Sequence, residues 1–180
     1  MRRNILALRK KLGAAEAEIL SKKITNSLIS LDIFKKSDVI ALYVPIKNEV
    51  DLMSLLSEKG KRFVFPRVEN GTKKLTFYEA ENSDDFEQGS FNIPEPKTTL
   101  NKVDIENIDL FLVPGVAFSE KCERIGYGGG FYDTTLKYKN KNARTLGIAF
   151  SSQIVGEGFS EPFDERLDAV ATPERIFINN

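Results

Sequence analysis

The sequence contains no histidine among its 180 residues. This absence excludes histidine-based catalytic triads, histidine general bases and zinc sites that use histidine ligands. Any chemistry must therefore rely on carboxylates, lysine, arginine, tyrosine, backbone donors or a metal ion. Phosphoryl transfer is compatible with that set, because it depends mainly on positioning and on charge neutralisation.

Three further features are scarce or missing. The one cysteine, Cys122, excludes an internal disulfide framework and agrees with a reducing compartment. The formal net charge is zero, so there is no general attraction to nucleic acid or to an anionic membrane. No apolar run approaches membrane-spanning length, and no apolar segment follows the charged N-terminus. We therefore expect a cytoplasmic protein with neither nucleic-acid nor membrane partners.

The chain also lacks internal repeats and low-complexity segments. Its 180 residues, 41% of them hydrophobic, are enough for one sizeable core but too few for two. We therefore predict a single domain over residues 1–180.

The most informative stretch begins with a strand-like apolar run at 109–113, which Pro114-Gly115 ends. A charged loop leads to Arg124 and to the glycine cluster at 126–130, and a helix is predicted from 131 to 136. Strand, glycine loop and helix start in this order are typical of a phosphate-binding site, since glycines let the backbone approach the ligand and the helix dipole favours an anion.

Two side chains fit that interpretation. Arg124 carries a planar set of donors suited to phosphate oxygens, and Asp133 offers the hard oxygen ligand that Mg²⁺ prefers. Simpler alternatives stay open: a flexible glycine turn, a surface arginine, and an aspartate that stabilises a helix start. The dinucleotide fingerprint needs a glycine where Phe131 stands, and no Gly-Lys-Ser/Thr follows for a P-loop. The residues alone thus predict an anion-binding loop and nothing finer.

Residues 113–133 resemble the signature of the 5-formyltetrahydrofolate cyclo-ligase family, also called 5,10-methenyltetrahydrofolate synthetase. That signature reads Pro-Gly-x-x-Phe and then Arg-Leu-Gly-x-Gly-x-Gly-Tyr-Tyr-Asp. The chain departs from the family at Cys122, which replaces a glycine, and at Phe131, which replaces a tyrosine. The resemblance implies ATP- and Mg²⁺-dependent cyclisation of 5-formyltetrahydrofolate to 5,10-methenyltetrahydrofolate.

The resemblance also implies roles for individual residues. Arg124 and Asp133 are implied to be catalytic, and Asp133 and Asp164 to hold Mg²⁺. The implied nucleotide-binding residues are Arg2, Arg124, Ile125, Gly126, Tyr127, Gly128, Gly129, Gly130, Phe131 and Tyr132. The implied folate-binding residues are Val44, Glu49, Tyr127, Gly128, Gly129, Gly130 and Phe131.

Helical periodicity predicts two helices at the start of the chain, at 2–12 and 14–31. Their basic cluster is by itself typical of a solvated helix face; it comprises Arg2, Arg3, Arg9, Lys10 and Lys11. The family has a Lys-x-x-x-Arg pair here that reaches the nucleotide phosphates, and its arginine corresponds to Arg2. Its lysine would precede Met1, so the chain lacks it or Arg3 substitutes.

Four further strands are predicted: a buried one at 38–44, a second at 61–65 closed by Pro66, a third at 74–79 and a fourth at 144–150. Glu49 follows the first, at a strand end where α/β proteins bind ligands, but it could instead cap, with Asp51, the short helix expected at 52–58.

Residues 80–108 are expected to form an ordered loop. Its Ile-Pro-Glu-Pro motif resembles that of the family. Glu95 of this motif is expected to be a structural or a pocket-lining residue. In the tail at 164–172, which also matches the family, Asp164 is a metal ligand or a surface-loop aspartate. Phe163 stands before it where family members often have a histidine.

Alternating strands and helices predict an α/β fold, a single three-layer domain with a mainly parallel sheet covered on both faces; the resemblance adds some antiparallel pairing. We expect a monomer that acts on small molecules. Two other classes remain: a sugar-phosphate isomerase or CoA-transferase-like enzyme, and a nucleotide-binding regulator that consumes no ATP.

Overall fold

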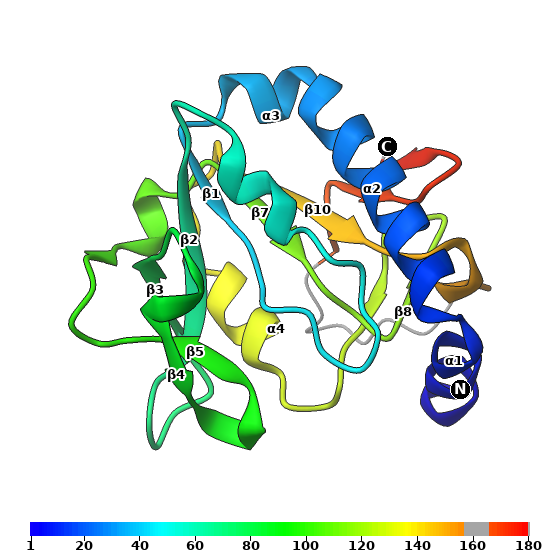
Figure 1. Cartoon of the computed structure of the whole chain (residues 1–180), viewed down its shortest axis with the longest axis horizontal. Helices are drawn as coiled ribbons and strands as arrows, with labels where there is room; N and C mark the ends of the chain where they lie inside the picture. Colours follow the sequence, from blue (N-terminus) through cyan, green and yellow to red (C-terminus); the bar gives the residue numbers. More distant parts are fainter. Residues whose placement is uncertain (157–165, 180) are drawn as a thin grey trace.

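The computed structural model describes residues 1–156 and 166–179 and contains an eight-stranded mixed sheet, ordered β13-β12-β10-β7-β1-β2-β3-β6 (Figure 1). Its strands are β1 (Val39–Ala41), β2 (Arg62–Val68), β3 (Leu75–Glu79), β6 (Lys102–Val103), β7 (Leu110–Val113), β10 (Arg144–Ile148), β12 (Ala169–Ala171) and β13 (Ile176–Ile178). The α-helices are α1 (Arg2–Lys11), α2 (Ala14–Ser30), α3 (Asp32–Lys36) and α4 (Phe131–Leu136).

The centre of the sheet is parallel and its margins are antiparallel. β1 pairs in parallel with β2 and β7, β7 with β10, and β10 with β12. The antiparallel pairs are β12 with β13, β2 with β3, and β3 with β6. The predicted α/β fold with a mainly parallel, mixed sheet is therefore confirmed.

Alternation along the buried strands divides the core between the two faces of the sheet. Leu110 and Leu112 of β7 pack with the α2 residues Ile24 and Leu28 on one face. Phe111 and its neighbours pack on the other face, because successive side chains of a strand point to opposite sides. Figure 1 shows α2 and α3 along the first of these faces.

The second face is covered differently from the prediction. Besides α4, a small sheet packs there, made of β8 (Ala117–Ser119), β9 (Arg124–Ile125) and β11 (Ile154–Val155) in the order β11-β8-β9. Between Pro114 and Arg124, only a charged loop was predicted from the sequence. Ala117 and Phe118 pair with Ile125 and Arg124, so this loop is a short hairpin that fixes the start of the glycine segment.

The backbone conformation of Cys122 explains why the family has glycine at this position. Cys122 lies in the hairpin turn with φ of +61°, a left-handed conformation that favours glycine. Its thiol is fully buried, and burial raises the pKa of Cys122 to about 11. The cysteine is therefore a packing residue and not a reactive one.

Strand β2 does not end at Pro66, as the sequence predicted, but continues to Val68. The carbonyl of Phe63 accepts a hydrogen bond from the N–H of Ala80, directly after β3, whereas the carbonyl of Val64 accepts one from Leu42 on the β1 side. Pro66 has the same orientation as Val64, and β1 has ended at that level. The missing N–H therefore costs no hydrogen bond to a neighbouring strand.

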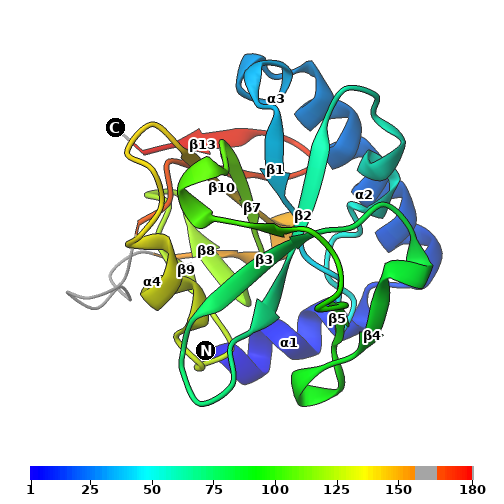
Figure 2. The same ribbon diagram turned by 90° about the vertical axis from the view of Figure 1, so that its left-hand side faces the viewer.

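The predicted loop at 80–108 contains a hairpin of β4 (Phe86–Gln88) and β5 (Pro94–Pro96) together with the edge strand β6. Short 3₁₀ turns join these elements, at Ser83–Asp85, Ser90–Asn92 and Ile105–Asn107. The sequence did not predict these strands, because the segment is polar and each strand has only two or three residues. In both Figures 1 and 2, the hairpin and α1 lie at the lower end of the molecule.

The helices agree with the sequence except in two places. α3 was not predicted, and the helix expected at 52–58 is a 3₁₀ turn at Met53–Ser57. The carboxylate of Asp51 accepts a hydrogen bond from the N–H of Met53, the first residue of this turn, while Leu52 occupies the N-cap position. A further 3₁₀ turn is at Ser151–Gln153. Over the described residues, no helix combines the length and apolar character needed to cross a membrane.

We predict that Phe111→Ala lowers the free energy of unfolding by about 3–5 kcal/mol. The Phe111 ring is fully buried and makes an edge-to-face contact with Phe77, with ring centroids 5.7 Å apart. Urea titration measures the loss. As a control, truncation of exposed Ile178 should change stability by less than about 0.5 kcal/mol. Equal losses for the two variants would contradict this two-faced core.

Candidate active site

A cleft of about 710 Å³ opens where the parallel strands β1, β2 and β7 reach their carboxyl ends. This volume is typical of small-molecule sites. All but one of the site residues predicted from the sequence line this cleft. The predicted residues that line it are Arg2, Val44, Glu49, Arg124, Ile125, Gly126, Tyr127, Gly128, Gly129, Gly130, Phe131, Tyr132 and Asp133. The exception, Asp164, lies outside the described residues.

The glycine segment has a defined shape that other residues would not adopt easily. Gly128 and Gly130 have φ of +102° and +70°. A Cβ on Gly126 would lie 2.7 Å from Nη1 of Arg124, and one on Gly129 would lie 2.6 Å from the Phe131 ring. These close approaches show that the glycines shape the cleft wall, beyond providing a flexible turn.

Arg124 is buried, so it is not the surface charge that the sequence left as an alternative. Its Nη2 donates to Oδ1 of Asp133 at 2.5 Å, and its guanidinium lies 5.6 Å from the centroid of the Tyr132 ring. Its Nε is buried without a hydrogen-bond partner. A buried donor without a partner calls for a specific explanation, and a bound anion in the cleft is one.

Asp133 sits in the first turn of α4, as predicted, and its side chain remains 24% exposed. The described residues contain no group of three or more Asp, Glu, Cys or His that could hold a metal ion. Mg²⁺ commonly takes one or two carboxylates and completes its coordination with water and substrate phosphates. A carboxylate in the cleft therefore fits Mg²⁺ only in combination with phosphate oxygens.

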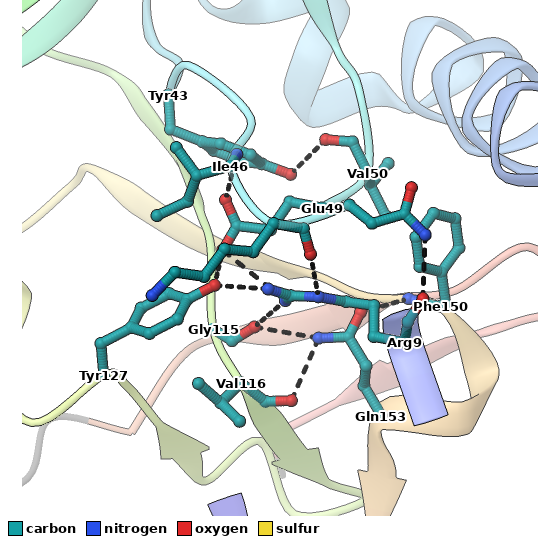
Figure 3. A network of polar contacts seen from close by, with 12 residues as sticks. Arg9, Tyr43, Ile46, Glu49, Val50, Gly115, Val116, Tyr127, Phe150 and Gln153 are labelled. Carbon is teal, nitrogen blue, oxygen red and sulfur yellow. Dashed lines mark hydrogen bonds and ion pairs between the residues drawn. The ribbon is translucent and has the colours of Figure 1, made fainter. Parts of the chain in front are cut away.

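Glu49 lies at the other side of the cleft and is 7% exposed (Figure 3). Its Oε2 accepts a hydrogen bond from the N–H of Ile46 at 3.1 Å, and its Oε1 accepts one from the Tyr127 hydroxyl at 2.8 Å. Burial raises the pKa of Glu49, against the opposing effects of the Ile46 N–H and the positive charge of Arg9. Glu49 is thus a cleft residue, and it is the Asp51 carboxylate that accepts a hydrogen bond from the following turn.

Arg9 overturns the expectation that the basic residues of α1 all lie on a solvated face. It is 1% exposed and donates to the carbonyls of Lys47 and Gly115, at 3.0 and 3.2 Å, and to the Tyr127 hydroxyl. The sequence did contain a signal. Arg9 follows Ile5 by four residues, so the two share one helix face, and Ile5 is buried.

The other basic residues at the start of α1 are exposed. Arg2 Nε donates to the carbonyl of Gly126 at 3.0 Å, which places this side chain beside the glycine segment. Arg3 does not line the cleft, so nothing in its position suggests that it substitutes for the family's lysine.

The tip of the β4–β5 hairpin forms a wall of the cleft that the sequence reasoning missed. Phe91 has φ of +58° and is 74% exposed, yet its ring centroid lies 6.0 Å from that of Phe131. Glu95, on the same hairpin, is buried, lines the cleft and accepts from the N–H of Val68 at 3.3 Å. Glu95 is therefore both structural and pocket-lining.

Two tyrosines of the site, buried Tyr43 and partly exposed Tyr127, are hydrogen-bond donors. Burial raises the pKa of Tyr127 to about 12, and burial also raises the pKa of Tyr43 well above its usual range. Both phenols therefore keep their protons near neutral pH. The Tyr43 hydroxyl donates to the carbonyl of Val50 at 2.8 Å, and the Tyr127 hydroxyl donates to Glu49.

Comparisons with known proteins agree on one family. A sequence profile described as the 5-formyltetrahydrofolate cyclo-ligase family matches residues 1–173. The 5-formyltetrahydrofolate cyclo-ligase of Mycoplasma pneumoniae is 32% identical, with 97% of each chain covered. That of Haemophilus influenzae is 30% identical, with 93% of this chain and 92% of the relative covered.

Solved structures give the same result. The Aquifex aeolicus 5,10-methenyltetrahydrofolate synthetase superposes with a TM-score of 0.85 at 33% identity, covering 99% of this chain and 90% of that one. The 5,10-methenyltetrahydrofolate synthetase of M. pneumoniae gives a TM-score of 0.78 at 30% identity, with 96% of each chain covered.

We predict that Glu49→Gln becomes more stable relative to the parent as pH rises. The pKa of Glu49 is raised in the folded protein, so ionisation lowers the stability of the parent as pH increases from the unfolded value of about 4.3 through the folded value. A glutamine has no charge to bury and escapes that loss.

Thermal melts between pH 4 and pH 8 measure this difference. The control is Glu16→Gln, a substitution at an exposed position of α2. A stability difference between Glu49→Gln and the parent that stays constant with pH, or shrinks as pH rises, would contradict the effect of burial on Glu49.

Proposed function

The chain belongs to the 5-formyltetrahydrofolate cyclo-ligase family, and we propose that it converts 5-formyltetrahydrofolate and ATP to 5,10-methenyltetrahydrofolate, ADP and phosphate, with Mg²⁺. One observation carries the proposal. One cleft is lined on one side by the glycine segment and by buried Arg124, whose Nε has no hydrogen-bond partner, and on the other side by the buried carboxylate of Glu49. We propose that the whole chain acts as one domain and as a cytoplasmic monomer.

The reaction explains why both ligands must share a cleft. A formamide carbonyl is a poor electrophile and its oxygen is a poor leaving group. In the proposed route the formyl oxygen takes the γ-phosphoryl group of ATP and ADP departs. N10 then attacks the formyl carbon, loses its proton and displaces phosphate, which closes the ring. Holding the reactants in line and neutralising charge are the protein's tasks.

We assign the phosphates to the glycine segment. The backbone at 126–130 and the following helix start favour an anion, and Arg124 adds a buried guanidinium whose Nε has no partner. Arg2 lies beside Gly126 and adds a second positive charge. Ile125, Tyr132 and the remaining cleft residues of this segment would surround the nucleotide.

The Mg²⁺ would be held by Asp133, with Asp164 as the second proposed ligand. When bound, the ion neutralises phosphate charge during phosphoryl transfer. Asp133 also orients Arg124 through their ion pair, so this carboxylate holds the guanidinium against the glycine segment.

We assign the folate to the side formed by Glu49. Its carboxylate can accept hydrogen bonds from the N–H groups of the reduced pterin, and Val44 and Phe131 provide apolar walls. Tyr127 and the backbone of Gly128, Gly129 and Gly130 lie between this side and the phosphate side. This arrangement would place the formyl group between the two halves of the cleft.

The direct test is the absorbance rise of methenyltetrahydrofolate when the protein is mixed with Mg-ATP and 5-formyltetrahydrofolate. We expect turnover with ADP released in equal amount. A sugar-phosphate isomerase or CoA-transferase-like enzyme would release no folate-dependent ADP, and a non-catalytic regulator would bind ATP without consuming it. Either result would contradict the proposed function.

Arg124→Ala should lower kcat/KM by roughly ten- to a hundredfold, since a charge-assisted contact is worth about 1.5–3 kcal/mol. Steady-state turnover measures this loss, and circular dichroism checks that the variant is folded. Arg175→Ala is the matched control, because Arg175 is exposed and its ion pair with Glu120 lies outside the cleft. An unchanged rate for Arg124→Ala would remove Arg124 from the site.

Asp133→Asn should increase the Mg²⁺ concentration that gives half-maximal rate, since an amide oxygen is a weaker ligand than a carboxylate. A Mg²⁺ titration of initial rates at saturating ATP measures the change. If the titration curve of Asp133→Asn overlays that of the parent, the metal assignment is wrong.

A further inference from the structure

Arg9 contacts three segments of the cleft wall although it is not among the residues that line the cleft. Its Nε donates to the carbonyl of Lys47 in the turn after β1, and its Nη1 donates to that of Gly115 after β7. Its Nη2 donates to the hydroxyl of Tyr127 in the glycine segment. Figure 3 shows the guanidinium between Glu49, Tyr127 and Gly115.

The charge of Arg9 is balanced within this network by one carboxylate. Glu49 Oε1 lies 3.6 Å from Nη1 of Arg9, and their side chains are 5% and 1% exposed. The other acceptors of the guanidinium are neutral. Burying a charge is costly unless it is paired and hydrogen-bonded, so a residue that only filled space here would be better apolar. The placement therefore indicates a task that needs the charge.

The hydroxyl of Tyr127 links the two charged groups. It accepts from Arg9, so its single proton is directed to Oε1 of Glu49, at 2.8 Å. Without the donor on Arg9, the phenol could turn its proton away from the carboxylate. Arg9 thus fixes the direction of the hydrogen bond between the glycine segment and Glu49.

Helix α1 also holds the turn that presents Glu49. Lys47 and Asn48 both have left-handed φ values, +48° and +61°, and the N–H of Glu49 donates to the carbonyl of Ile46 at 3.0 Å. Arg9 takes the Lys47 carbonyl, while the Asn48 amide donates to the carbonyls of Arg9 and Leu12 at 2.8 and 3.1 Å. Since Lys47 is strained in this conformation, the turn depends on α1 to keep its shape.

We propose that Arg9 is a positioning residue for folate recognition, which keeps the Glu49 carboxyl group turned toward the cleft and keeps the Tyr127 hydroxyl directed at it. The inference rests on the proposed function of the cleft. Arg9 acts through these two residues, because it is not itself part of the cleft lining. Arg9 belongs to α1, so the proposal makes the first helix part of the folate side as well as of the phosphate side.

A pH effect follows from the charges that face Glu49. These are Arg9 on α1, Lys47 on its own segment, and the neutral phenols of Tyr43, Tyr127 and Tyr132. Arg9 and Lys47 lower the pKa of Glu49 while burial raises it. Removing Arg9 should raise this pKa further, and Glu49 would then be protonated at a higher pH. The acid limb of kcat/KM should move to higher pH.

The experiment compares Arg9→Gln and Arg9→Lys with the parent and with Lys10→Gln, a change at the exposed neighbouring position of α1. For Arg9→Gln we expect the KM for 5-formyltetrahydrofolate to rise about tenfold or more, with the KM for ATP within about twofold of the parent value. The acid limb should shift upward. Arg9→Lys should restore the acid limb but only part of the folate KM, because it keeps the charge and loses the planar fork.

A titration of the Glu49 carboxyl by carbon-13 NMR gives a readout that needs no turnover. We expect its midpoint to rise in Arg9→Gln and to stay near the parent value in Lys10→Gln. If the parent itself shows no turnover, the proposed function fails while this titration still tests the Arg9–Glu49 link. If Arg9→Gln does not fold, Arg9→Lys tests the proposal by itself. We then expect its KM for 5-formyltetrahydrofolate to exceed that of the parent, and an unchanged value would contradict the proposal.

Two results would overturn the inference. One is a folded Arg9→Gln whose folate KM, acid limb and Glu49 titration all equal those of Lys10→Gln. The other is an equal loss toward both substrates with no shift of the acid limb, which would make Arg9 a structural residue only.

Discussion

The guanidinium of Arg9 must be hydrogen-bonded in a place that water scarcely reaches, and three of the groups that it contacts belong to the turn after β1, the segment after β7 and the glycine segment. Satisfying this buried charge therefore brings the walls of the cleft together. Glu49 provides the balancing negative charge, and Gln153 adds a donor to the Gly115 carbonyl that Arg9 also uses. A charge that is costly to bury thus acts as a constraint on the geometry of the cleft.

The sheet prepares the place for this contact. Because β1, β2 and β7 are parallel, their carboxyl ends meet at one edge, and the segments that follow β1 and β7 enter the cleft there. The strands alternate between two apolar faces, one under α2 and one under α4, so the edge is held from both sides. The glycine segment then crosses that edge, where Gly126 and Gly129 leave room for Arg124 and Phe131.

Sequence patterns predicted those parts of the fold whose signal lies in adjacent residues. Apolar runs predicted β1, β7 and β10, helical spacing predicted α1 and α2, and the glycine-rich spacing located the segment that lines the cleft. The β4–β5 and β8–β9 hairpins escaped because strands of two or three residues show no clear period. The end of β2 was wrongly predicted at Pro66, because a strand can contain a proline where its neighbouring strand has already ended. Arg9 was missed because a charge was taken as solvated, although the spacing from Ile5 placed it on the buried face.

The central claim is that one cleft holds the nucleotide phosphates against the glycine segment and the folate against Glu49. A crystal structure with 5-formyltetrahydrofolate and a non-hydrolysable ATP analogue tests it most directly. The account predicts phosphate oxygens within hydrogen-bond distance of Arg124 and of the backbone at 126–130, and the pterin ring bonded to the Glu49 carboxylate. Ligands bound elsewhere, with the glycine segment facing only solvent, would contradict it.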